Sequence, residues 1–210
     1  KQDNLHYVKL RKMINSKNLN LTTVGLAALA TILVRVMPHP PNLTPIIALA
    51  LFSGSQFKNG NPFSSMIFPL LAMFISDAVI GFHQGMVVVY ALIASINIFG
   101  RFFLPDNNYS IKKLLMISLG SSCFFFVGSN FFVWLQGSMY PKSLAGLGMC
   151  YAAALPFFTR ESLTFVNSGQ LIFGSFFMNG LFGDLLFTLV FFHSAFKVKS
   201  FYGNRIQNPI

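Results

Sequence analysis

The sequence predicts an all-α, polytopic integral membrane bundle of about six transmembrane helices. Three observations support this prediction: 54% of the 210 residues are hydrophobic, only 10% are charged, and the charged residues fall mostly in short segments between long apolar stretches. A soluble domain carries about 25% charged residues, and about 20 consecutive apolar residues suffice to cross a bilayer. The hydrocarbon core of a membrane is therefore the expected solvent for most of the chain.

The first quarter of the chain predicts a polar arm and two helices. Residues 1–18 are polar and basic, which suits the anionic lipids of a cytoplasmic leaflet. Residues 19–37 are apolar and predict a first helix, which ends at the cluster of prolines in 38–41. Because more apolar stretches follow, we expect this helix to be retained and not cleaved as a signal peptide. A second, short helix is predicted from about Pro45, a residue suited to a first helical turn, to the polar turn at 58–62.

Four apolar stretches then follow before the last span. Three of them predict helices over about 63–82, 86–104 and 113–136. The fourth stretch, residues 144–158, has about 15 residues, which is short for a span. We therefore expect an extra interfacial or re-entrant helix there.

Charge placement predicts which side of the membrane each end occupies. The last span lies within 170–196 and precedes a basic tail, residues 197–210, so the transmembrane domain covers about 19–196. With the amino terminus inside, most Lys and Arg residues lie on the cytoplasmic side, as the positive-inside rule requires. Both termini are therefore expected in the cytoplasm. If residues 144–158 formed a seventh span, the basic tail would face outward, which makes that alternative weaker.

Four ionisable residues fall within the predicted helices, where each needs a partner, a cavity or a function. Arg35 and Asp77 lie near the outer ends of their helices, so their depths allow an ion pair. Two roles stay open for this pair, a structural one and the binding of a polar ligand. Arg101 lies near the inner end of its helix, where its side chain is expected to reach the headgroups. Asp184 lies near mid-membrane beside glycines, where a helix–helix hydrogen bond is the simplest role.

Polar residues gather in the predicted outer half of the bundle. Tyr90, Asn97 and Arg101 share one face of the 86–104 helix, which should point into the bundle. Binding sites combine apolar walls with a few convergent polar groups, and a pocket covered by the proline-rich loop fits that description. His39 and His83 are the weakest candidates, because loop histidines are common. The candidate substrate-binding residues are Arg35, His39, Asn42, Asp77, His83, Tyr90, Asn97, Asn130, Trp134 and Tyr140, and the candidate structural polar residues are Arg101 and Asp184.

The sequence also argues against several classes of protein. A net charge of +10 would suggest nucleic acid in a soluble protein, but here the basic residues lie in the tails and alternate loops, so no nucleic-acid partner is expected. Cys123 and Cys150 lack metal-ligand spacing, and we expect both to be small buried hydrophobic residues. The sequence contains no Walker A, nucleophile-elbow or HExxH motif, so we expect no built-in ATPase, metal or cofactor.

One motif carries a resemblance to known proteins. Residues 35–45, Arg-Val-Met-Pro-His-Pro-Pro-Asn-Leu-Thr-Pro, together with stretches at 76–77, 150–158 and 183–184, resemble a family of uncharacterised bacterial membrane proteins. That family is similar to the substrate-binding S components of energy-coupling-factor (ECF) transporters. The resemblance implies an ECF S-component-like fold in a bacterial inner (plasma) membrane and an outer pocket for a small vitamin- or metabolite-like solute. It also implies separate partners, a transmembrane coupling subunit and ATPases.

Three functions from different classes follow. The leading one is a membrane transport protein that is not an enzyme and that captures a small solute at an outward-facing pocket for uptake driven by partner subunits. The alternative is a non-transporting integral subunit of a larger membrane complex, in which the polar groups serve packing and the outer face is closed. A membrane enzyme acting on a lipid or isoprenoid is the third, and the small number of Asp and Glu residues, 5 in all, disfavours it.

Overall fold

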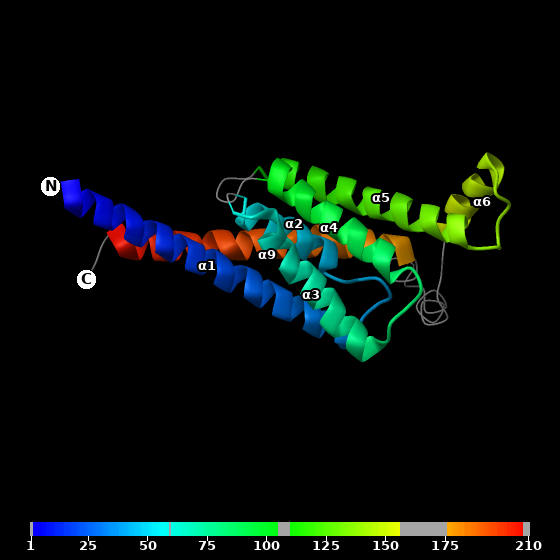
Figure 1. The fold of residues 1–210 in the computed structure, drawn as a ribbon, viewed down its shortest axis with the longest axis horizontal. Helices are drawn as coiled ribbons and strands as arrows, with labels where there is room; N and C mark the ends of the chain where they lie inside the picture. The colour runs from blue at the N-terminus through cyan, green and yellow to red at the C-terminus, as the bar shows by residue number, and fades with distance from the viewer. Residues whose placement is uncertain (1, 59, 105–109, 156–175, 208–210) are drawn as a thin grey trace.

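The computed structural model describes residues 2–58, 60–104, 110–155 and 176–207, except for the side chains of 2–16 and 203–207. Every regular element in these ranges is an α-helix, so the predicted all-α class is confirmed. The helices, labelled in Figure 1, are α1 (Gln2–Val36), α2 (Ile46–Gln56), α3 (Pro62–Ile80), α4 (Met86–Phe103), α5 (Ile111–Gln136), α6 (Leu144–Ala154) and α9 (Phe176–Gln207).

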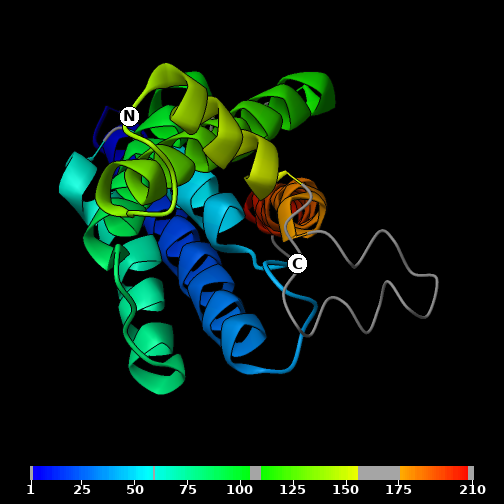
Figure 2. The same cartoon turned by 90° about the vertical axis from the view of Figure 1, so that its right-hand side faces the viewer.

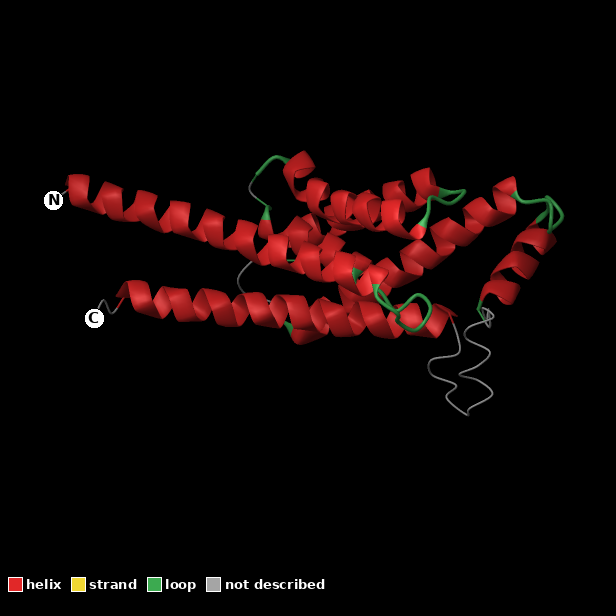
Figure 3. Cartoon of the chain, turned by 90° about the horizontal axis from the view of Figure 1, so that it is seen from below, coloured by secondary structure: helices red, strands yellow, loops and turns green. Residues whose placement is uncertain are grey.

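Five helices are long and apolar enough to cross a membrane, namely α1, α3, α4, α5 and α9. The apolar part of α1 is Lys17–Val36, and that of α9 is Phe176–Tyr202. The predicted polar arm continues α1 without a break, so the first span is the second half of a 35-residue helix. The amino-terminal half of α1 and the carboxy-terminal half of α9 project together beyond the other helices, at the end where both termini lie (Figure 3).

The short helix α2 occupies the centre of the bundle. All of its 11 residues are buried. It contacts all five long helices, and Figure 2 shows it near the middle of the bundle. At 1.5 Å per residue it is about 16 Å long, roughly half the thickness of a hydrocarbon core. The predicted second helix is thus present, but the bundle has five long spans around a buried, half-length α2.

We call the end of the bundle where the termini lie the basal end and the opposite end the distal end. Helices α1, α3 and α5 run from the basal end to the distal end, and α4 and α9 run back (Figure 1). Helix α5 ends and α9 begins at the distal end, so the chain between them makes no net crossing. Within that stretch α6 packs on α5 and has 11 residues, too few for a span. This agrees with the predicted interfacial or re-entrant helix and not with a seventh span. Residues 156–158 of that prediction lie outside the described residues.

Helices α2 and α4 cross with their backbones in contact. A methyl group on Gly100 would lie 2.2 Å from the carbonyl oxygen of Leu51, and one on Gly54 would lie 2.1 Å from that of Asn97. Only glycine permits this approach, because any larger side chain would overlap the facing backbone. The crossing closes the basal half of the bundle, which leaves the distal half as the place for a cavity.

Candidate functional site

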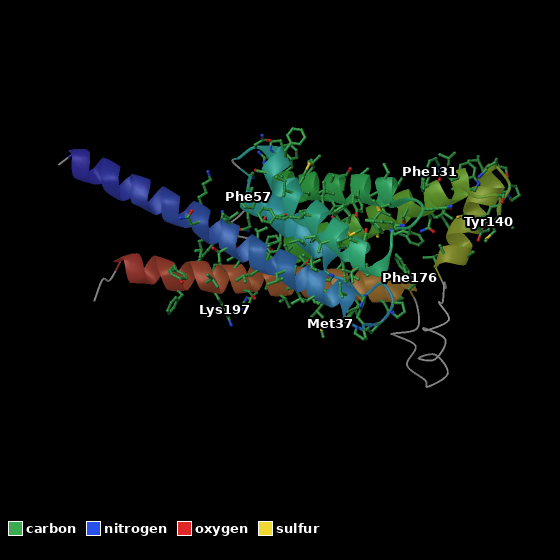
Figure 4. The ribbon with its side chains drawn as sticks, turned by 60° about the horizontal axis from the view of Figure 1, so that its bottom comes forward. Met37, Phe57, Phe131, Tyr140, Phe176 and Lys197 are labelled. Atoms are coloured by element: carbon green, nitrogen blue, oxygen red, sulfur yellow. The ribbon has the colours of Figure 1, made fainter. Side chains whose placement is uncertain are left out.

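A pocket of about 770 Å³ lies in the distal half of the bundle. Its walls come mainly from α5, α6, α9, the proline-rich loop that follows α1 and the first turn of α2, and single residues or pairs of residues of α1, α3 and α4 complete them. Along α9 the lining runs from Phe176 to Asp184, which is about 12 Å of helix. Figure 4 shows Met37, Phe176 and Tyr140 at this end, with Phe57 and Lys197 towards the other. The polar residues of the described lining are Arg35, His39, Asn42, Thr44, His83, Ser122, Ser129, Asn130, Tyr140 and Asp184.

The structure divides the predicted substrate-binding residues into two groups. Those in the first group line the pocket, and those in the second lie elsewhere. The lining group is Arg35, His39, Asn42, His83, Asn130 and Tyr140, and the other group is Asp77, Tyr90, Asn97 and Trp134. Asp184, which we predicted to have a structural role, also lines the pocket.

Arg35 and Asp77 form the predicted ion pair at the rim of the pocket. Arg35 Nη2 donates to Asp77 Oδ1 at 2.5 Å, and Arg35 Nε donates to Ser76 Oγ at 2.6 Å. The hydroxyl of Tyr90 donates to the other oxygen of Asp77 at 2.8 Å. Helices α1, α3 and α4 are therefore joined by one network, in which each charge has an opposite partner. Asp77 and Tyr90 do not line the pocket, but they hold Arg35, which does.

The proline-rich loop is fixed against α9. Asn42 has a positive φ of 64° and donates through Nδ2 to the carbonyl oxygen of Phe176 at 2.9 Å. Asn179 Nδ2 donates to the carbonyl oxygen of Pro41, also at 2.9 Å. A methyl group on Gly180 would lie 2.4 Å from Asn42 Nδ2, so this glycine allows the loop to approach the helix. These contacts make the loop one wall of the pocket.

Asp184 lies at the basal limit of the lining along α9. It is 5% exposed, and its Oδ2 accepts a hydrogen bond from Ser122 Oγ of α5 at 2.7 Å. One turn further towards the basal end, the hydroxyls of Ser118 and Thr188 lie 3.2 Å apart. The predicted helix–helix hydrogen bond of Asp184 is thus confirmed, and the carboxyl group belongs to the pocket wall as well.

Aromatic rings line the distal part of the pocket. Phe125 and Phe126 come from α5, Phe176 and Phe177 from α9, and Tyr140 from the segment after α5. The rings of Phe126 and Phe177 meet edge to face with centroids 4.7 Å apart. Such contacts hold aromatic side chains in defined positions, so this part of the pocket has a fixed apolar wall.

Two of the intramembrane polar residues, Asn97 and Arg101, form hydrogen bonds in the basal half of the bundle. Asn97 is fully buried, donates to the carbonyl oxygen of Ala50 at 3.0 Å and accepts from Ser65 Oγ at 2.8 Å. It therefore joins α2, α3 and α4 away from the pocket. Arg101 donates to carbonyl oxygens of the turn between α2 and α3, including that of Phe57 at 2.8 Å. Its guanidinium thus holds the basal turn between these helices, and the expected reach of Arg101 to the headgroups stays a prediction.

Trp134 and the histidines have local roles. The indole N–H of Trp134 donates to the carbonyl oxygen of Pro141 at 2.9 Å, and Lys142 donates to the carbonyl oxygen of Trp134 itself. These bonds fix the segment that carries Tyr140. His39 lies within hydrogen-bond distance of the carbonyl oxygen of Met37, at 2.7 Å. His83 makes a similar contact with its neighbour in the loop before α4, at 2.9 Å.

The cysteines differ in their surroundings. Cys150 is buried as predicted, but Cys123 is exposed on α5, so that part of the prediction was wrong. The buried face of α5 is formed instead by serines, including Ser118 and Ser122, which face α9. Within the described part of the chain, no group of three or more His, Cys, Asp or Glu side chains could hold a metal ion.

Comparison with known proteins supports the predicted membership of an uncharacterised family. A family model described as "Family of unknown function (DUF6580)" matches residues 15–204, which is most of the chain. Searches of curated proteins and of solved structures gave no match. The similarity to ECF S components stays a prediction. The chain belongs to the DUF6580 family, and it has the helices of a multi-pass membrane protein.

Proposed function

We propose that this protein is a non-enzymatic membrane transport protein that captures a small solute in its distal pocket, in the manner of an ECF S component. The pocket of about 770 Å³ is the observation that supports this proposal best, because sites for small molecules and cofactors measure about 300–1,000 Å³. Its mostly apolar walls with a few polar groups also fit such a site.

The distal end is the outer side in this proposal. The basal half contains the end of α2, the start of α5 and the last part of α9, which carry or adjoin Lys58, Lys112, Lys197 and Lys199. The distal segment before α6 carries Lys142. Lys and Arg collect on the cytoplasmic side of membrane proteins, so the basal end and both termini face the cytoplasm of a bacterial inner membrane. A solute then enters the pocket from outside, and its passage inward needs partner subunits, a transmembrane coupling subunit with ATPases.

Native mass spectrometry of the detergent-purified protein tests this proposal, with a matched pair of variants. Ala154 lines the pocket, whereas Ala152, on the same helix, is exposed and does not. The wild-type protein and Ala152→Phe should retain a small molecule, and Ala154→Phe should lose it because the larger ring fills the pocket. Equal retention by both variants would place the molecule elsewhere and refute capture in this pocket.

The same experiment distinguishes solute capture from the alternative function, that of a non-transporting integral subunit. A non-transporting integral subunit would be released from native lipid without a solute and together with the other subunits of its complex. An empty protein that co-purifies in such an assembly would therefore reject solute capture. A bound solute, or a co-purifying ATPase with its coupling subunit, would support it.

A further inference from the structure

We propose that the pocket accepts a solute with an ammonium group, held at Asp184, and an apolar body that contacts the aromatic wall. This inference rests on the proposed function, because it names the class of solute for the same pocket. Asp184 and the phenylalanine rings belong to the same described lining, with Asp184 at its basal limit. The arrangement thus offers a negative group at the base of a mostly apolar cavity.

Among the residues that the structure describes, none with a positive charge pairs with Asp184. Its hydrogen-bond partner among the described residues is the neutral hydroxyl of Ser122, and the next polar pair along the helices, Ser118 with Thr188, is also neutral. A carboxylate removed from water is unfavourable unless an opposite charge compensates it. An ammonium group at this position would supply that charge and donate a charge-assisted hydrogen bond.

The other charges of the lining do not favour an anion. In the described part of the lining, Arg35 is the residue that is always cationic, and Asp77 already balances its charge at 2.5 Å. A ligand carboxylate would have to share that guanidinium with Asp77. His39 and His83 are ionisable but lie in exposed loops at the distal rim, away from the base of the pocket.

The remaining polar and aromatic groups fit the same solute. Asn130 lines the pocket and donates its amide nitrogen to the carbonyl oxygen of Phe126 at 2.9 Å, and its side-chain oxygen is a further acceptor on a lining residue. Phe125, Phe126 and Phe177 present rings to the cavity, and the faces of aromatic rings attract cations. Acceptors and ring faces both favour a ligand that brings hydrogen-bond donors and positive charge.

One feature of the lining favours the opposite charge. Ile46 and Ile47, in the first turn of α2, also line the pocket, and the N–H groups of a first helical turn attract anions. The deciding comparison is therefore between ligands of equal shape and different charge. Three probes meet this need: 2-phenylethylammonium, neutral 2-phenylethanol and anionic 3-phenylpropanoate.

Isothermal titration of the full-length protein in lipid nanodiscs, with empty nanodiscs subtracted, gives the affinity for each probe. Wild-type protein should bind 2-phenylethylammonium about tenfold or more tightly than 2-phenylethanol, as a charge-assisted hydrogen bond predicts. Asp184→Asn should abolish this preference, because the variant side chain carries no charge. Thr188→Val, one turn away and outside the lining, should retain the preference.

The outcomes separate this inference from the proposed function. Tighter binding of 3-phenylpropanoate or of the alcohol would overturn the ammonium class and still leave a pocket that captures solutes. An undiminished preference in Asp184→Asn would also overturn the role of Asp184. Binding of none of the probes to wild-type protein would overturn the ammonium class, whereas solute capture itself is decided by the native mass spectrometry of Ala154→Phe and Ala152→Phe. If Asp184→Asn fails to fold, the ranking of the three probes on wild-type protein still decides.

Discussion

The ion pair at the pocket rim predicts a large loss of stability for Asp77→Asn. Asp77 is 2% exposed and accepts hydrogen bonds from Arg35 at 2.5 Å and from Tyr90 at 2.8 Å. The change leaves the Arg35 guanidinium, only 14% exposed, without a counter-charge. Removing one partner of a buried ion pair costs about 3–5 kcal/mol. For a chain of this size each kcal/mol lowers Tm by about 2–4 °C, so Tm should fall by about 6–20 °C.

Thermal unfolding in detergent, followed by circular dichroism, measures this change. The matched control is the double variant Arg35→Gln with Asp77→Asn, which restores neutrality and should be more stable than Asp77→Asn alone, with a coupling energy of about 0.5–3 kcal/mol. Because Asp77 is not in the lining, the folded single variant should still bind solute at low temperature. An unchanged Tm with lost solute binding would refute the reasoning, since it would make Asp77 a binding residue.

Two further predictions concern packing and topology. Gly100→Ala should lower the free energy of unfolding by about 1–3 kcal/mol, because its methyl group would meet the Leu51 backbone, whereas Gly120→Ala, with open space around it, should be neutral or slightly stabilising. A Tm for Gly100→Ala equal to that of wild type would contradict the close crossing. In a cysteine-free background, Lys142→Cys should react with an impermeant maleimide on intact cells and Lys197→Cys only after lysis; the reverse pattern would invert the topology.

The spans and the rim ion pair could be predicted from the sequence. The long spans appear as uninterrupted apolar stretches bounded by proline, glycine and polar segments, and α3, α4 and α5 begin and end within a few residues of the prediction. Arg35 and Asp77 could be paired because each sits at the same depth near the end of its helix. Depth along a helix is a property of one segment, so sequence reveals it directly.

Contacts between helices could not be predicted in the same way, because they depend on which faces meet. Asn97 was grouped with the binding residues, but its neighbours on α2 and α3 lie in the basal half. Asp184 was assigned to packing alone, since sequence did not reveal the cavity beside it. Cys123 lies in an apolar stretch on a face that packing leaves exposed. Neither the depth nor the polarity of a residue determines its rotation towards or away from neighbouring helices.

The central position of α2 limits how a solute could reach the cytoplasm. All 11 residues of α2 are buried, and its crossing with α4 has no room for even a methyl group. A path between α2 and α4 would require these helices to separate at the crossing where their backbones touch, and α2 also contacts the other four long helices. If this chain delivers the proposed solute, its route would therefore have to leave the α2–α4 crossing intact, as a turn of the whole body that moves the pocket mouth to the other side would do.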